Sequence, residues 1–131
     1  MSNSWNLSDL GRALARREAQ SLLDEVEGVM AVVVASVDGF DVASAVRNDT
    51  DPARVAAMAS SISAISAVVS QEVALGRSKS VTIDTESGFA MVHSVHRAES
   101  ELIINVVAGG NAVLGQVAYR TAQMARALAV A

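Results

Sequence analysis

Hydrophobic and polar positions follow one another along the chain in blocks that predict helices and strands. From Ser8 to about Glu27, apolar residues recur at spacings of three and four, which is typical of an amphipathic helix. From Val29 to Val37 the chain is almost continuously apolar and rich in β-branched residues, as in a central strand covered on both faces. Asp38-Gly39 is a strong signal for a tight type I′ hairpin turn, so Phe40–Val46 is predicted as the partner strand.

The remainder of the chain predicts a second long helix, three strands and a last helix. Pro52, with Asp51 as cap, begins a helix that continues to about Leu75 and ends at Gly76. Three short segments are predicted as strands and a fourth as the final helix, namely Ser80–Thr85, Phe89–Val95, Glu101–Val107 and Ala112 to about Ala129. The order α-β-β-α-β-β-β-α predicts an α/β fold, a sandwich with a five-stranded antiparallel sheet between helices. We expect one domain over residues 1–131, with its core at about 8–129.

Composition narrows the classes of function. The chain has 131 residues, 51% of them hydrophobic, and a net charge of −4, which suits a domain with a real core and argues against nucleic acid or an anionic membrane as partner. It has no cysteine, which excludes disulfides and thiolate chemistry. The amino terminus lacks a basic start followed by an apolar run, so we expect no signal peptide and a cytoplasmic location. Leu102 to Tyr119 carries no charge, but polar residues and glycines interrupt it, which favours a strand and a helix over a membrane span.

The motifs for catalysis and cofactor binding are incomplete. Gly110 and Gly115 have the spacing of a phosphate-binding loop, but Gln116-Val117 stands where that motif needs lysine and serine or threonine. His93 and His96, the only histidines, lie three apart near a strand end and so point to opposite faces. We therefore expect no catalytic residue, no cofactor and no metal.

The middle helix is unusual because no charge occurs between Arg54 and Glu72. We predict that its larger apolar residues pack on the sheet, namely Val55, Met58, Ile62, Ile65 and Val69. Most of the other positions are alanine and serine, Ala56 and Ala59 included, where exposed helices usually carry glutamate and lysine. We predict that this surface contacts a second copy of the chain or a partner protein, through Ala57, Ser60, Ser61, Ala64 and Ala67. The alternative is that alanine is present only because it favours helix formation.

Four segments together carry a family resemblance. They are Glu27–Gly39, the Ala/Ser-rich helix that ends at Gly76, the strands turned at Gly88, and Leu114-Gly115-Gln116-Val117. In order and spacing, over about Leu10 to Leu128, they resemble the Roadblock/dynein-light-chain family.

The resemblance implies a homodimer and a partner. In this family the middle helices of two subunits meet, and the strand after that helix pairs edge to edge, which here adds Val81 and Ile83 of Ser80–Thr85 to the interface. Bacterial members partner a small Ras-like GTPase, and some stimulate its GTP hydrolysis by reshaping it. Our leading interpretation is therefore a non-catalytic homodimeric regulator or scaffold of such a GTPase.

Two further questions stay open at this stage. Arg77 is a candidate partner contact, as an arginine finger, although we favour a role in capping the end of the middle helix. The main alternative function is a structural adaptor that leaves nucleotide turnover unchanged. A small-molecule sensor would need a pocket, and four aromatic residues among mostly small side chains offer little to line one.

Overall fold

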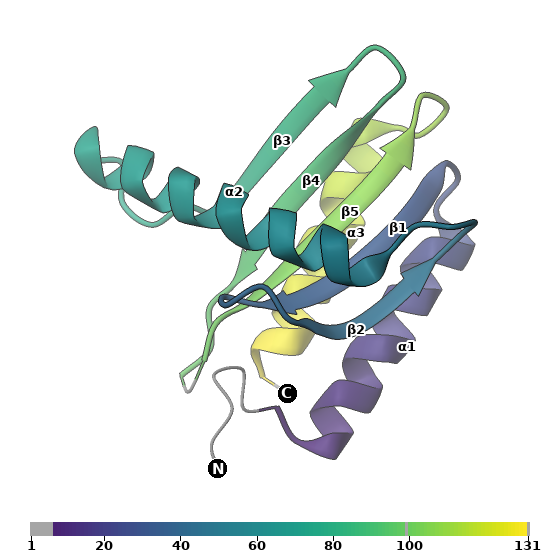
Figure 1. The fold of residues 1–131 in the computed structure, drawn as a ribbon, viewed down its shortest axis with the longest axis horizontal. Coiled ribbons are helices and arrows are strands. Elements are labelled where there is room, and N and C mark those ends of the chain that lie inside the picture. The colour runs from purple at the N-terminus through teal and green to yellow at the C-terminus, as the bar shows by residue number, and fades with distance from the viewer. Residues whose placement is uncertain (1–6, 99, 131) are drawn as a thin grey trace.

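The computed structural model describes residues 7–98 and 100–130, and it confirms the predicted order of helices and strands (Figure 1). The elements are α1 (Asp9–Glu25), β1 (Val29–Ser36), β2 (Asp41–Val46), α2 (Pro52–Glu72), β3 (Ser80–Thr85), β4 (Gly88–Val95), β5 (Leu102–Gly109) and α3 (Leu114–Ala129). The five strands form one antiparallel sheet in the order β2-β1-β5-β4-β3. Helices α1 and α3 cover one face and α2 crosses the other (Figure 1). The amino-terminal residues on which we based the expectation of no signal peptide include residues 1–6, which lie outside the described part of the chain.

The helix starts follow from side-chain caps. The Ser8 hydroxyl accepts a hydrogen bond from the backbone N–H of Gly11 at 3.0 Å, and the Asp51 carboxylate accepts one from Ala53 at 3.1 Å. Each cap satisfies an amide that has no partner within its own helix. Pro52 then occupies the first turn of α2, where its missing N–H costs nothing.

The turn between β1 and β2 differs from the type I′ turn that we predicted. A type I′ turn needs positive φ at both central residues, but here only Gly39 has it, at 90°. The loop is longer, because the Ser36 N–H donates to the Phe40 carbonyl at 2.9 Å and the Gly39 N–H to the Ser36 carbonyl at 3.0 Å. The pairing of β1 with β2 also shifts between Val34 and Ala35. Because of this irregularity, the tip of the hairpin is wider than the type I′ turn that Asp38-Gly39 predicted.

The larger hydrophobic core lies between the sheet and the layer of α1 and α3. Alternate strand residues such as Val32, Val34 and Ile104 point into it, where they meet Leu22 and Leu128 of the helices. On the opposite face, Val33, Ala35 and Ile103 point toward α2 and form a smaller core. The alternation explains why β1 and β5 are apolar at nearly every position: both of their faces are covered.

Helix α2 packs on the sheet through a face that differs in part from the one we predicted, because Val55 and Ile62 contact the smaller core as expected but the other large residues do not. Val55, Ala56 and Ala59 are its buried residues, so the two alanines that we placed on the surface are in the core. Small side chains let the helix approach the strands closely, and this contact sets its rotation. The pattern of large residues was therefore a poor guide to the packed face.

As a result, three residues of the predicted core stripe are exposed. Met58, Ile65 and Val69 have 50%, 65% and 54% of their surface accessible. For Ile65 and Val69 the physical reason can be followed in Figure 1, where α2 crosses the strands and its last turns extend beyond β3, the edge of the sheet. Among the described residues, no strand lies beneath those turns. Met58 lies in the first half of the helix, on the side that turns away from the buried Ala56 and Ala59.

Candidate interaction surface

The exposed side of α2, the residues that follow it and the neighbouring edge strand β3 carry several exposed large apolar side chains. We call them together the α2–β3 surface, and they are Met58, Ile65, Val68, Val69, Val73, Leu75 and Ile83. Leu75 is 76% exposed and Ile83 is 41% exposed. Exposed apolar side chains that gather in this way are typical of surfaces that bind another molecule.

A groove runs between α2 and β3 within this surface. Ile62, Ile65 and Val69 of α2 line one side and Val81 of β3 the other, around a volume of about 380 Å³. Val81 and Ile83 both point to the α2 side of the sheet, because they pair with Val92 and Ala90 of β4. Val81 is therefore half-buried beside the helix, whereas Ile83 lies beyond it.

A second hollow lies where α2 leaves the sheet uncovered. Met30, Ile83, Ala90 and Val107 are among the residues that line it, around a volume of about 280 Å³. In Figure 1 this part of β3, β4 and β5, toward the β3–β4 turn, has no helix in front of it. The hollow gives the α2–β3 surface a concave, apolar floor.

Strand β3 is an edge of the sheet with unpaired backbone groups along its outer side. Within the part of the chain that the structure describes it pairs only with β4, over all six residues from Ser80 to Thr85, and it contains no proline. Such an edge can pair with a further strand. Lys79 precedes the strand, and Asp84 and Glu86 lie at its other end.

The structure distributes the predicted interface residues over two flanks of α2. Ala57, Ser61, Ala64 and Ala67 are exposed. Ser60 is half-buried instead, and its hydroxyl donates to the Val37 carbonyl at 2.6 Å, so it faces the β1–β2 hairpin of its own subunit. Our sequence reasoning missed Val68, Val73 and Leu75, and it assigned Ile65 to the core. The signal that was available is that α2 carries more large apolar residues than one packed face can accommodate.

Arg77 lies in the loop after α2, where Gly76 has a φ of 84°. Backbone groups close the helix end, because the N–H groups of Ala74 and Leu75 donate to the carbonyls of Gln71 and Ser70. Within residues 7–98 and 100–130, the Arg77 guanidinium makes no hydrogen bond or ion pair. The helix-capping role that we favoured therefore has no contact to support it in the described part of the chain.

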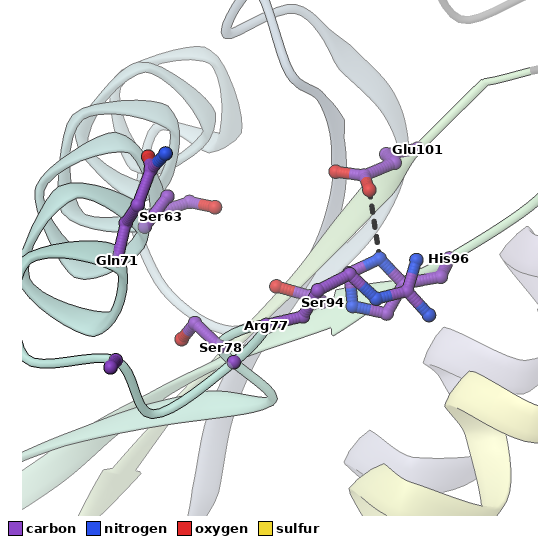
Figure 2. Close-up of a pocket in the computed structure, with 10 residues that line it drawn as sticks. Ser63, Gln71, Arg77, Ser78, Ser94, His96 and Glu101 are labelled. Carbon is purple, nitrogen blue, oxygen red and sulfur yellow. Dashed lines mark hydrogen bonds and ion pairs between the residues drawn. The ribbon is translucent and has the colours of Figure 1, made fainter.

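A third hollow, the largest of the three, lies on the opposite flank of α2 (Figure 2). It has a volume of about 480 Å³ between α2, the loop that follows it, and the ends of β4 and β5. Its polar lining includes Arg77, Ser94, His96 and Glu101. The His96 Nδ1 and Glu101 Oε1 atoms are 2.8 Å apart. We had expected that mostly small side chains would offer little to line a pocket. The small side chains here leave a hollow between the elements because they do not fill the space.

Two other findings bear on function. Among the residues that the structure describes, no three histidine or acidic side chains gather where they would hold a metal ion. Helix α2 is long and apolar enough to cross a membrane by length and composition alone, and 17% of its residues in that window are buried. Its first half is part of the smaller core, however, which ties it to the sheet.

Comparisons with known proteins agree with this geometry. Residues 16–108 match the Roadblock/LC7 domain. No protein of curated function matches the chain.

Three solved structures have the same fold at low sequence identity. A Roadblock/LC7 domain from Streptomyces avermitilis is 18% identical and aligns over 86% of this chain and 92% of its own, with a TM-score of 0.78. The gliding protein mglB from Thermus thermophilus is 16% identical over 99% and 96%, with a TM-score of 0.85. An MglB with tetrameric arrangement is 18% identical over 99% and 96%, with a TM-score of 0.84. The matched domain spans more than half of the sequence, and the chain belongs to the Roadblock/LC7 family.

Proposed function

We propose that this protein is a non-catalytic homodimer that binds a small Ras-like GTPase in the cytoplasm, as a regulator or a scaffold. The observation that carries the proposal is the α2–β3 surface, in which exposed apolar side chains lie beside an open strand edge. Both features are costly in water for an isolated subunit and are removed when a second copy covers them.

The proposed dimer pairs β3 with β3 of the second copy in antiparallel orientation. When Thr82 faces the same residue across the two-fold axis, Val81 of each copy lies opposite Ile83 of the other. All four apolar side chains are then on the α2 side of one continuous sheet. The same orientation brings Lys79 toward the end of the partner strand that carries Asp84 and Glu86, so the charges at the two ends are complementary.

The same two-fold arrangement also places helix α2 of each copy against the other copy. Val81 lies beside the helix, and Ile83 lies over the uncovered hollow at the other end of the strand. A two-fold axis through Thr82 exchanges these two ends. The last turns of the partner helix, with Val73 and Leu75 just after them, would therefore lie over the hollow that Met30, Ala90 and Val107 help to form. The two helices would meet along the α2–β3 groove.

Two observations support a GTPase as the partner, namely the family resemblance and the incomplete phosphate-binding motif of this chain. The loop at Gly110–Gly115 has no lysine to reach the outer phosphates of a nucleotide, so the nucleotide chemistry belongs to the partner. A dimer that joins two α2 helices presents their outer residues, Ala57, Ser61 and Ala64, as one small-residue surface. We propose that this surface is accessible to the GTPase.

The dimer is tested by the molar mass of the full chain in solution, measured by light scattering after size exclusion. We expect the mass of two chains, and a shift to one chain when Ile65→Glu places a charge in the α2–β3 groove, where the two helices would meet. The matched control is Ala13→Glu, at an exposed position on α1, and it should remain a dimer. Monomeric wild-type protein, or a dimer that Ile65→Glu leaves unchanged, would overturn the proposed interface.

The proposed binding of a GTPase is tested by measuring binding and GTP turnover with small Ras-like GTPases from the same genome. Binding that raises GTP turnover identifies a regulator that activates its partner, whereas binding without a change in turnover identifies a scaffold. If Arg77→Ala abolishes the stimulation but preserves binding, Arg77 acts on the transition state, where one guanidinium contributes about 10³–10⁵ in rate. The absence of binding to every such GTPase would refute this half of the proposal.

A further inference from the structure

Helix α2 has two flanks, and only one of them faces the proposed dimer axis. The other flank lines the hollow of about 480 Å³, which we call the flank cavity (Figure 2). We propose that the flank cavity binds a small organic carboxylate, with Arg77 as the residue that recognises the charge. The proposal does not depend on the GTPase, because it concerns a different class of ligand and shares only Arg77 with the contacts tested above.

The size and the walls of the flank cavity fit a small molecule. Ligand sites in proteins typically have volumes of about 300–1,000 Å³ and combine apolar walls with a few polar groups. Ala67 and Ala74 supply methyl groups on the α2 side, and Gly76 adds no side chain to fill the space. An apolar body of modest size can therefore enter and be partly desolvated.

Polar side chains surround this space from three sides. Figure 2 shows Ser63 and Gln71 on α2, Arg77 and Ser78 in the following loop, and Ser94 and His96 across the cavity near Glu101. The hydroxyls and the amide are hydrogen-bond groups without charge of their own. They can orient a ligand, but they do not select its charge.

Charge selection falls to Arg77. Its guanidinium has no partner within the described residues, whereas Arg47 donates to two backbone carbonyls and Arg120 pairs with Glu25. A guanidinium presents a planar set of donors that matches the two oxygens of a carboxylate. An uncommitted arginine at the rim of a cavity is thus suited to hold an acid whose body lies inside.

Among the residues that the structure describes, Glu101 is the one acidic residue in the lining, and it would repel an anion if it were free. Its Oε1 atom, however, is 2.8 Å from His96 Nδ1, so the histidine engages the carboxylate. The His96 Nε2 atom is buried and has no hydrogen-bond partner in the described part of the chain. With Nδ1 bound to Glu101, Nε2 accepts a hydrogen bond in the neutral ring and donates one in the charged ring.

The test is a titration of the full chain, labelled with ¹⁵N and followed by NMR, with three probes. Benzoate has the charge and an apolar ring, benzamide has the ring without the charge, and acetate has the charge without the ring. We expect saturable shifts of the amides of Gln71, Ser78 and Ser94 with benzoate, and binding weaker by about tenfold or more with each of the other two probes. Equal affinity for benzoate and benzamide, or shifts that scatter over other surfaces, would overturn the proposal.

Two variants and a control locate the site. Arg77→Gln should weaken benzoate binding by about tenfold or more, since a charge-assisted hydrogen bond is lost. Arg17→Gln makes the same change at an exposed position on α1, outside the lining, and should bind benzoate as the wild type does. Ala67→Leu, at an exposed position, fills part of the cavity and should block binding without unfolding the chain. Equal effects of Arg77→Gln and Arg17→Gln would show that only net charge matters and would refute the specific site.

Discussion

The hydroxyl of Ser60 donates a 2.6 Å hydrogen bond to the carbonyl of Val37, which ties the middle of α2 to the tip of the β1–β2 hairpin. The tip also approaches the helix at Gly39, where an added Cβ would lie 3.4 Å from the Cα of Ala57. The wider loop brings its backbone against the helix at these two points. A serine that the sequence placed on an outer interface thus has a partner inside its own subunit.

This contact predicts a modest loss of stability in Ser60→Ala. We expect the free energy of unfolding to fall by about 0.5–1.5 kcal/mol, because one hydrogen bond is lost and the Val37 carbonyl loses a partner. Urea denaturation measures it. Ser61→Ala is the matched control, since the Ser61 hydroxyl only contacts the Ala57 carbonyl of its own helix at 3.4 Å. Equal losses in the two variants would contradict the role of the Val37 contact.

Arg47 joins the end of α1 to the start of β1 and predicts a larger effect. Its Nη2 donates to the Leu23 carbonyl at 2.8 Å and its Nε to the Val29 carbonyl at 3.2 Å. We expect Arg47→Met to lower the free energy of unfolding by about 1–3 kcal/mol, because both carbonyls lose a charged donor. Arg54→Met, at an exposed position on α2, should change stability by less than about 0.5 kcal/mol. Thermal or urea unfolding of both variants checks this difference.

Gly88 begins β4 where two backbones are too close for any side chain. A Cβ at this position would lie 2.1 Å from the carbonyl oxygen of Ala108 on β5. We expect Gly88→Ala to cost more than about 1 kcal/mol, because the β4–β5 pairing must shift to make room. Gly115→Ala in α3 meets nothing within 4 Å and should preserve or raise stability. A mild effect at Gly88 would show that the strand end relaxes easily.

Asp41 predicts a pH dependence of stability. Burial raises the pKa of the Asp41 carboxyl above its ordinary value of 3.8, and the charge of Asp51 acts in the same direction, while the Ser44 hydroxyl opposes them. The folded state therefore holds the proton more tightly than the unfolded state. This contribution to stability is present at low pH and is lost as pH rises through the raised pKa.

Asp41→Asn isolates this contribution. The variant should gain stability relative to the wild type as pH rises above 3.8, and the difference should level off once Asp41 is ionised in both states. The effect is small, because Asp41 is exposed and solvent screens its charge. Urea denaturation from about pH 3 to pH 7 measures it. A difference that does not change with pH would contradict the raised pKa.

The order of elements could be predicted because strand and helix periods are strong signals here. The valine-rich run of β1 and the alternation around Val81 have few other interpretations. The rotation of α2 could not be predicted in the same way. Its contact with the sheet is made by Ala56 and Ala59, and alanine is equally common on exposed and on close-packed helix faces.

The candidate surfaces were predicted in part for a related reason. The absence of charge between Arg54 and Glu72 was the basis for our prediction that α2 contacts another molecule, but it does not show which of the apolar residues extend beyond the sheet. That depends on where β3 ends the sheet relative to the helix, which is a property of the whole fold. The flank cavity depends likewise on Arg77 and Ser94 meeting from distant parts of the chain.

The two outer strands of the sheet differ from each other, and the difference limits how further strands can add to the sheet. Strand β3 is regular, whereas β2 contains an extra residue, Val42, at the register shift, and it begins with the charged Asp41. Bulges and charges on an edge discourage the addition of another strand. Edge-to-edge addition is therefore favoured on one side only, so that it stops after a single event and does not run on into a fibre.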